Sequence, residues 1–164
     1  MSRIEELQKQ IKELNEKLEA EIEKRKDVKC PFKEGDSYFV LHNDGSFTSD
    51  CWEDYECETD IWSQGNVFKT EREAKLESDR RALLTKFKRF RDQCNGDWKP
   101  DFTCQKINKY SLYFDSNNGR LYVEASALFN HFALFGYFKD VEDAKVAIEL
   151  FGDEIKRLFM EVEQ

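Results

Sequence analysis

The side chains that most often carry catalysis are few in this chain. It has two histidines, His42 and His131, and no glycine-rich loop of the kind that holds phosphates. His42 precedes the turn residues Asn43-Asp44-Gly45, where we expect it to be solvated. His131 lies among apolar residues, where a partly buried, hydrogen-bonded histidine is expected. Neither position suggests a nucleophile or a general base, so we predict no catalytic residue and no enzyme.

The cysteines do not form a recognisable metal or disulfide pattern. Their number is odd and their spacing irregular, unlike the even framework of a small secreted domain. Cys51 and Cys57 have five residues between them, and only the two histidines remain to complete a zinc site. We therefore predict reduced thiols, no bound metal and no cofactor. The five thiols are those of Cys30, Cys51, Cys57, Cys94 and Cys104.

Carboxylates concentrate between Asp44 and Asp60, and no lysine or arginine occurs from His42 to Val67. Aromatic residues interrupt this stretch, and aromatic anchors within a charged rim are typical of a protein-binding surface that attracts a basic partner. The alternative is a solvated loop that crosses a sheet edge with its aromatic side chains in the core. The candidate partner-binding site, called the acidic segment below, consists of Asp50, Trp52, Glu53, Asp54, Tyr55, Glu56, Glu58 and Trp62.

A second candidate surface is basic. Eight lysines and arginines occur from Arg72 to Arg91, and they give the later turns of a predicted helix a positive face. Such a face can contact nucleic acid or an acidic ligand, or it can pair with acids of the same chain. The residues of this alternative site are Arg80, Arg81, Lys88 and Arg89.

Composition limits the classes of protein to consider. A chain of 164 residues has room for one globular domain and an appendage. Charged residues make up 37% and aromatic residues 14% of the chain, which indicates a buried core under highly charged helices. The net charge of −8 disfavours general binding to phosphate backbones. No apolar run is long enough for a membrane span or a signal segment, so we expect no membrane contact and a cytoplasmic location.

The first element that must position these surfaces is an N-terminal coiled-coil helix over residues 1–29. Apolar residues recur there at alternating steps of three and four, with isoleucine before leucine, which favours two parallel strands. We predict a homo-oligomer, with a dimer favoured, joined through residues 4–25. The alternative is an amphipathic helix that lies on its own domain. The oligomerisation residues are Ile4, Leu7, Ile11, Leu14 and Leu18.

Residues 30–164 are expected to form an α+β domain built from two similar β-β-β-α units, about 37–95 and 107–160. In the first unit, the turn signal at 43–45 predicts a hairpin and a third strand is expected around 65–68. Thr70 and Glu73 predict a capping box for a helix from Glu71 to about Cys94. The same order of signals returns about 70 residues later, with a hairpin over 109–124 and a third strand at 134–138. We expect both units to contribute to one antiparallel sheet packed by helices.

Two stretches resemble a group of small phage and prophage accessory proteins. They are residues 62–74, which read W-x-x-G-N-x-F-x-T-x-x-E-A, and residues 95–101, which read N-G-D-W-K-P-D. The short coiled-coil opening is a further similarity, and the resemblance covers most of residues 1–150. Members of the group are mostly uncharacterised. The resemblance implies a viral context and the cytoplasm of a bacterial host, and it implies no catalytic residue.

Three functions compete on these observations. The first is a phage-encoded interaction module that binds and inhibits a host factor, for example an anti-CRISPR-type inhibitor of a defence protein, through the acidic segment. The second is a structural or regulatory phage protein that contacts nucleic acid through its basic helix. The third is a protein that sequesters a small signalling molecule in a pocket between subunits, lined by aromatic residues and arginines.

Overall fold

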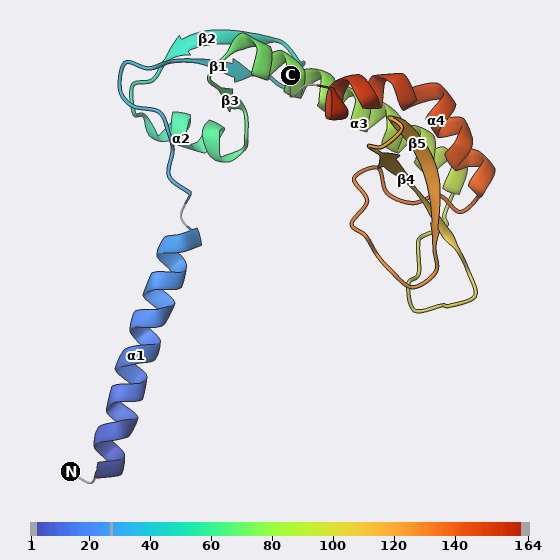
Figure 1. Ribbon diagram of the computed structural model, residues 1–164. Coiled ribbons are helices and arrows are strands. Elements are labelled where there is room, and N and C mark those ends of the chain that lie inside the picture. Colours follow the sequence, from blue (N-terminus) through green and yellow to red (C-terminus); the bar gives the residue numbers. More distant parts are fainter. Residues whose placement is uncertain (1–2, 27, 162–164) are drawn as a thin grey trace. The chain divides into compact units, whose positions relative to one another are not determined.

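The protein is described by a computed structural model that covers residues 3–26 and 28–161 and contains both helices and strands (Figure 1). It divides into two compact units. The N-terminal unit comprises residues 1–36 and 51–65, and the larger unit comprises residues 37–50 and 66–164. This division differs from the expected boundary after residue 29, because residues 51–65 return to join the segment that follows the first helix.

Helix α1 (Arg3–Lys26) is the expected N-terminal helix. Every side chain from Arg3 to Lys24 is exposed, including those of the apolar seam. Two surface ion pairs at i,i+4 spacing, Lys9 to Glu13 at 4.0 Å and Lys12 to Glu16 at 3.9 Å, support the helix only weakly. The seam therefore remains without cover in the isolated chain.

The rest of the N-terminal unit forms around Trp52. Its backbone N–H donates to the carbonyl of Asp36, and its own carbonyl accepts from Gly35, both at 2.8 Å. Its ring stacks on that of Phe32 at a centroid distance of 5.3 Å. Helix α2 (Glu56–Ser63) follows, an element that the sequence did not predict. These contacts join two segments that are about 16 residues apart along the chain.

The larger unit begins with the expected hairpin. Strands β1 (Ser37–Leu41) and β2 (Phe47–Cys51) are connected through Gly45, whose φ of 86° suits a tight turn. Strand β3 (Val67–Phe68) pairs antiparallel with β1, with Phe39 opposite Phe68. The strand order in this sheet is β2-β1-β3.

Helix α3 (Glu71–Asn95) has the predicted start and end. The Thr70 hydroxyl accepts from the Glu73 N–H at 3.2 Å, and the Glu73 carboxylate accepts from the Thr70 N–H at 3.0 Å. This reciprocal pair is the predicted capping box. Gly96, with a φ of 56°, follows the last turn.

The second half of this unit departs from the expected repeat. Strands β4 (Lys109–Asp115) and β5 (Arg120–Ser126) form the predicted hairpin, and helix α4 (Val141–Ile155) follows, continued by a π turn, η1 (Lys156–Met160). The third strand expected at 134–138 is reduced to a single bridge between Tyr110 and Phe138. The described strands form two separate sheets rather than one, because β4 and β5 pair only with each other.

The main hydrophobic core lies where α3, α4 and η1 pack together with the β4–β5 hairpin. Phe87 occupies its centre and is 1% exposed. Its ring lies 4.7 Å from that of Phe135, 5.3 Å from Phe151 and 5.8 Å from Phe138. The buried residues of this core are Leu83, Phe87, Phe138, Ala144, Ala147, Ile155 and Leu158.

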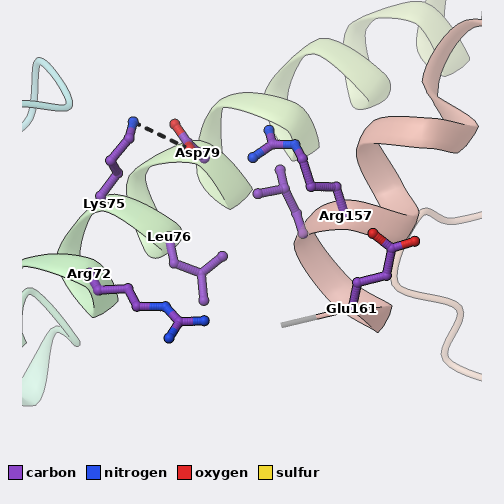
Figure 2. Close-up of a pocket in the computed structure, with 7 residues that line it drawn as sticks. Arg72, Lys75, Leu76, Asp79, Arg157 and Glu161 are labelled. Atoms are coloured by element: carbon purple, nitrogen blue, oxygen red, sulfur yellow. Dashed lines mark ion pairs between the residues drawn. The ribbon is translucent and has the colours of Figure 1, made fainter. Parts of the chain in front are cut away.

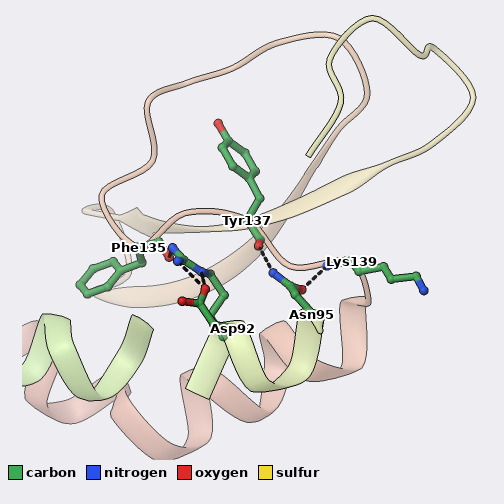
Figure 3. A network of polar contacts seen from close by, with 6 residues as sticks. Asp92, Asn95, Phe135, Tyr137 and Lys139 are labelled. Carbon is green, nitrogen blue, oxygen red and sulfur yellow. Dashed lines mark hydrogen bonds and ion pairs between the residues drawn. The ribbon is translucent and has the colours of Figure 1, made fainter. Parts of the chain in front are cut away.

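Asn95, the last residue of α3, connects this helix to the chain just before α4 (Figure 3). Its side-chain N–H donates to the Tyr137 carbonyl at 2.8 Å, and its side-chain carbonyl accepts from the Lys139 N–H at 2.9 Å. Next to it, Arg91 donates to the Phe135 carbonyl at 3.1 Å and pairs with Asp92. Two side chains therefore hold residues 135–139 on the end of α3.

Replacing Asn95 by alanine is expected to lower the free energy of unfolding by about 2 kcal/mol, since it leaves two backbone groups without their partners. Chemical denaturation measures this change. The matched control is Asn118→Ala in the β4–β5 turn, whose side chain bonds only to exposed groups. An equal loss in both variants would contradict a special role for Asn95.

Candidate functional site

The structure separates the residues of the acidic segment. Trp52 is 1% exposed, and Glu58 is buried as well. The Glu58 carboxylate accepts from the backbone N–H groups of Glu53 and Tyr55, which caps the start of α2. Both residues stabilise the N-terminal unit, so the prediction that they contact a partner directly is corrected.

The exposed part of the acidic segment is smaller than predicted. Glu53, Asp54, Tyr55 and Glu56 face solvent, whereas Trp62 is half-buried. Asp50 is also exposed, but it lies on β2 in the larger unit. A hydrogen bond to the Glu53 carboxylate, together with nearby negative charge, raises the pKa of the Tyr55 phenol. What remains is an acidic turn with one exposed aromatic ring.

The residues of the predicted basic face have different surroundings in the structure. The Arg80 side chain donates to the Leu158 carbonyl at 2.7 Å and lies over the Phe159 ring at 5.1 Å, so it joins α3 to η1. Lys88 lies in a small cleft beside Leu134 and Phe135. Arg81 and Arg89 line one cleft together. Arg80 is therefore engaged in a structural contact, whereas a role of the other three in nucleic-acid binding stays a prediction.

Arg81 and Arg89 line a polar cleft of about 580 Å³ between the β1–β2 turn and α3. The Ser78 hydroxyl donates to the Gly45 carbonyl at 2.8 Å and so connects the turn to the helix. Lys86 adds a third positive charge, and Asp44 is the one carboxylate among the lining residues that the structure describes. Sequence reasoning missed this cleft because its two walls are about 35 residues apart along the chain.

A second cleft, of about 340 Å³, lies between the start of α3 and η1 (Figure 2). Leu76 and Leu158 contribute its apolar lining. Its rim carries both signs of charge, and Lys75 pairs with Asp79 at 3.5 Å. Arg157, Glu161 and Arg72 complete the lining. Since groups of both signs line it, this cleft has no clear preference for a charged ligand.

No protein-family model, curated protein or solved structure matches the chain. The resemblance to phage accessory proteins therefore stays a prediction, and the site must be judged from its own residues.

Several exposed apolar side chains gather on the loop over residues 127–136, called the apolar loop below. Residues 127–138 include no charged residue, although such residues make up 37% of the chain. Phe132 is 90% exposed, and Leu128, Phe129 and Leu134 are exposed as well. His131, expected to be partly buried, is exposed. The absence of charged residues from this loop is visible in the sequence. An apolar stretch next to a strand, however, usually indicates a buried segment rather than an exposed one.

Polar contacts hold the backbone of the apolar loop in place. The Ser126 hydroxyl donates to the Phe129 carbonyl at 2.8 Å and accepts from the Phe129 N–H at 3.1 Å. The Asn130 side chain accepts from the Phe132 N–H at 2.9 Å, and the Tyr137 hydroxyl accepts from the His131 N–H at 2.7 Å. These bonds support a φ of 51° at Phe132, a conformation that is uncommon without glycine.

The side chains that could bind a metal are dispersed. Among residues 3–26 and 28–161, no group of three or more histidines, cysteines or carboxylates has a suitable arrangement. Burial and the neighbouring Asp143 carboxylate raise the pKa of the Cys94 thiol, which makes it a poor nucleophile. The described helices also include none with the length and apolar character to cross a membrane.

Proposed function

We propose that this protein is an oligomeric protein-interaction module. In this proposal, α1 joins copies of the chain and the apolar loop binds a partner protein. The observation that carries the proposal is the apolar loop, where four large apolar side chains are exposed on a hydrogen-bonded backbone.

The composition of the apolar loop is that of an interface centre. The cores of protein interfaces are depleted in charge and enriched in aromatic residues, and a few such anchors supply most of the binding energy. Phe129 and Phe132 are exposed anchors of this type. Hydrogen bonds from both of their backbone N–H groups hold the loop conformation, which reduces the entropy lost on binding. A partner with an apolar pocket fits this surface best.

Helix α1 supports the oligomeric part of the proposal. Its seam residues are 50–68% exposed, and Ile22, four residues after Leu18, is 44% exposed. An apolar stripe this narrow matches a second helix better than a broad protein surface. Two or more copies of the apolar loop on one assembly would raise the avidity for a multivalent partner.

The two halves of the larger unit also support a common origin by duplication. Phe39 pairs with Phe68 as Tyr110 pairs with Phe138, at offsets of about 70 residues. In each half, an extended cap residue precedes the helix, and the fourth helical residue, Ala74 or Ala144, is fully buried. The acidic turn and the apolar loop then occupy equivalent places, each between the second strand and the third extended piece.

We propose that the partner is a host protein in a phage-infected bacterium and that the module inhibits it. An anti-CRISPR-type inhibitor is one form of such a module. Support for the phage setting comes from the resemblance at residues 62–74 and 95–101 alone. The exposed acids Glu53, Asp54 and Glu56 would favour a partner with a positive surface.

The double variant Phe129→Ser and Phe132→Ser is expected to weaken partner binding at least about thirtyfold, because it removes both aromatic anchors. Affinity capture with quantitative mass spectrometry, in an infected bacterial lysate, compares it with the unchanged protein. The control variant is Leu150→Ser, which removes an exposed apolar side chain from α4 instead. If no captured protein depends on the loop residues alone, the proposal fails.

A further inference from the structure

The polar cleft between the β1–β2 turn and α3 is large enough for a small molecule. Its volume of about 580 Å³ lies within the range of roughly 300–1,000 Å³ that is usual for ligand sites. We propose that it binds a small molecule with a diphosphate group, of the size of a nucleoside diphosphate. The described residues that line this cleft belong neither to α1 nor to the apolar loop.

Arg81 is held in a fixed orientation at one end of the cleft. Its Nε donates to the Glu77 carboxylate at 2.8 Å, and its Nη1 donates to the Asn66 side-chain carbonyl at 2.6 Å. Asn66 is fixed in turn, because its backbone carbonyl accepts from the Leu41 N–H. A guanidinium anchored in this way keeps its position when a ligand binds, so little conformational entropy is lost there.

Lys86 and Arg89 supply the positive charge that attracts the ligand. Within residues 3–26 and 28–161, neither side chain forms an ion pair or a hydrogen bond. Given the helical rise of 1.5 Å per residue, they stand about 7.5 Å and 12 Å beyond Arg81 along α3. Positive charge is therefore spread over the length of a diphosphate and its attached group, rather than concentrated at one point.

Asp44 and its neighbours would contact the uncharged part of such a ligand. The Asp44 carboxylate accepts from the N–H and the hydroxyl of Ser46, and these bonds hold its pKa below the ordinary value. An ionised carboxylate can accept from sugar hydroxyl or amino groups. It also repels phosphate, so the diphosphate belongs at the Lys86–Arg89 end of the cleft.

Isothermal titration calorimetry of the full chain with ADP and with inorganic pyrophosphate tests the site. Both probes are expected to bind once per chain. Arg89→Gln and Lys86→Gln should each weaken binding about tenfold, since each removes a charged donor to phosphate. Asp44→Asn should tighten binding about threefold, because it removes the one carboxylate among the described lining residues and keeps the side-chain acceptor of the turn.

The matched control is Lys88→Gln, which removes the same charge from the same helix outside the cleft. It should leave the affinity for both probes unchanged. The proposal is overturned if neither probe binds, or if Lys88→Gln weakens binding as much as Arg89→Gln. It is also overturned if a 20-nucleotide single strand displaces ADP at low salt and binds more tightly, since the surface would then be a nucleic-acid contact. None of these results bears on the apolar loop.

Discussion

Replacing Phe87 by alanine is expected to lower the free energy of unfolding by about 3–5 kcal/mol, the range found for large aromatic residues in cores. Phe87 is buried at the centre of the main core, and its ring contacts three other rings. Removal loses both the buried area and the favourable ring geometry, and it leaves a cavity. Denaturant unfolding followed by circular dichroism measures the change.

The matched control is the same substitution at Phe132, which is 90% exposed. Phe132→Ala should change stability by less than about 0.5 kcal/mol, as expected for surface positions. Phe87→Ala should also loosen the end of the apolar loop, because Phe135 packs on the Phe87 ring. Faster amide exchange at residues 134–136 would show this coupling. Similar losses of stability at positions 87 and 132 would contradict the assignment of the core.

Replacing Leu14 by lysine in α1 is expected to weaken self-association by roughly two to four orders of magnitude. Burial of one leucine contributes about 1.5–3 kcal/mol, and a dimer loses two of them. The introduced lysines would also place like charges in the seam. Sedimentation equilibrium at micromolar concentration should show a multiple of the chain mass for the unchanged protein and a single chain for the variant.

Glu16→Lys is the control for this experiment. It places a lysine on the same helix two positions later, outside the seam, where only a weak surface pair with Lys12 is lost. Its oligomeric state should be unchanged. A Leu14→Lys variant that keeps the mass of the unchanged protein would show that α1 is not the oligomerisation element.

Local signals in the sequence predicted the elements whose causes are local. The Thr70–Glu73 capping box and Gly96 define the bounds of α3, because both depend on residues within one turn of the helix ends. Gly45 and Gly119 mark the two hairpin turns in the same way. The heptad spacing predicted α1 as a helix with an apolar seam.

Elements that lack such local signals were not predicted from the sequence, or were predicted with the wrong structure. Helix α2 has Tyr55 at its cap position rather than the usual serine, threonine or aspartate, so its start could not be recognised. The segment 134–138 has the composition of a strand, yet it makes one bridge only. Pairing over a longer stretch requires the edge of a neighbouring strand in the correct register. The sequence of one segment does not specify whether such an edge lies beside it.

By itself, the sequence determined an α+β chain with an N-terminal helix that carries an apolar seam, two hairpins and a capped central helix. Tertiary structure alone decided which apolar and charged residues face solvent. Trp52 is buried because Phe32 and the backbone of residues 35–36 surround it, whereas none of the helices and strands within residues 3–26 and 28–161 covers Phe132. Arg80 and Arg81 are adjacent in the chain but point to η1 and to the polar cleft. Exposure depends on contacts between distant segments, and a residue's type and spacing do not specify them.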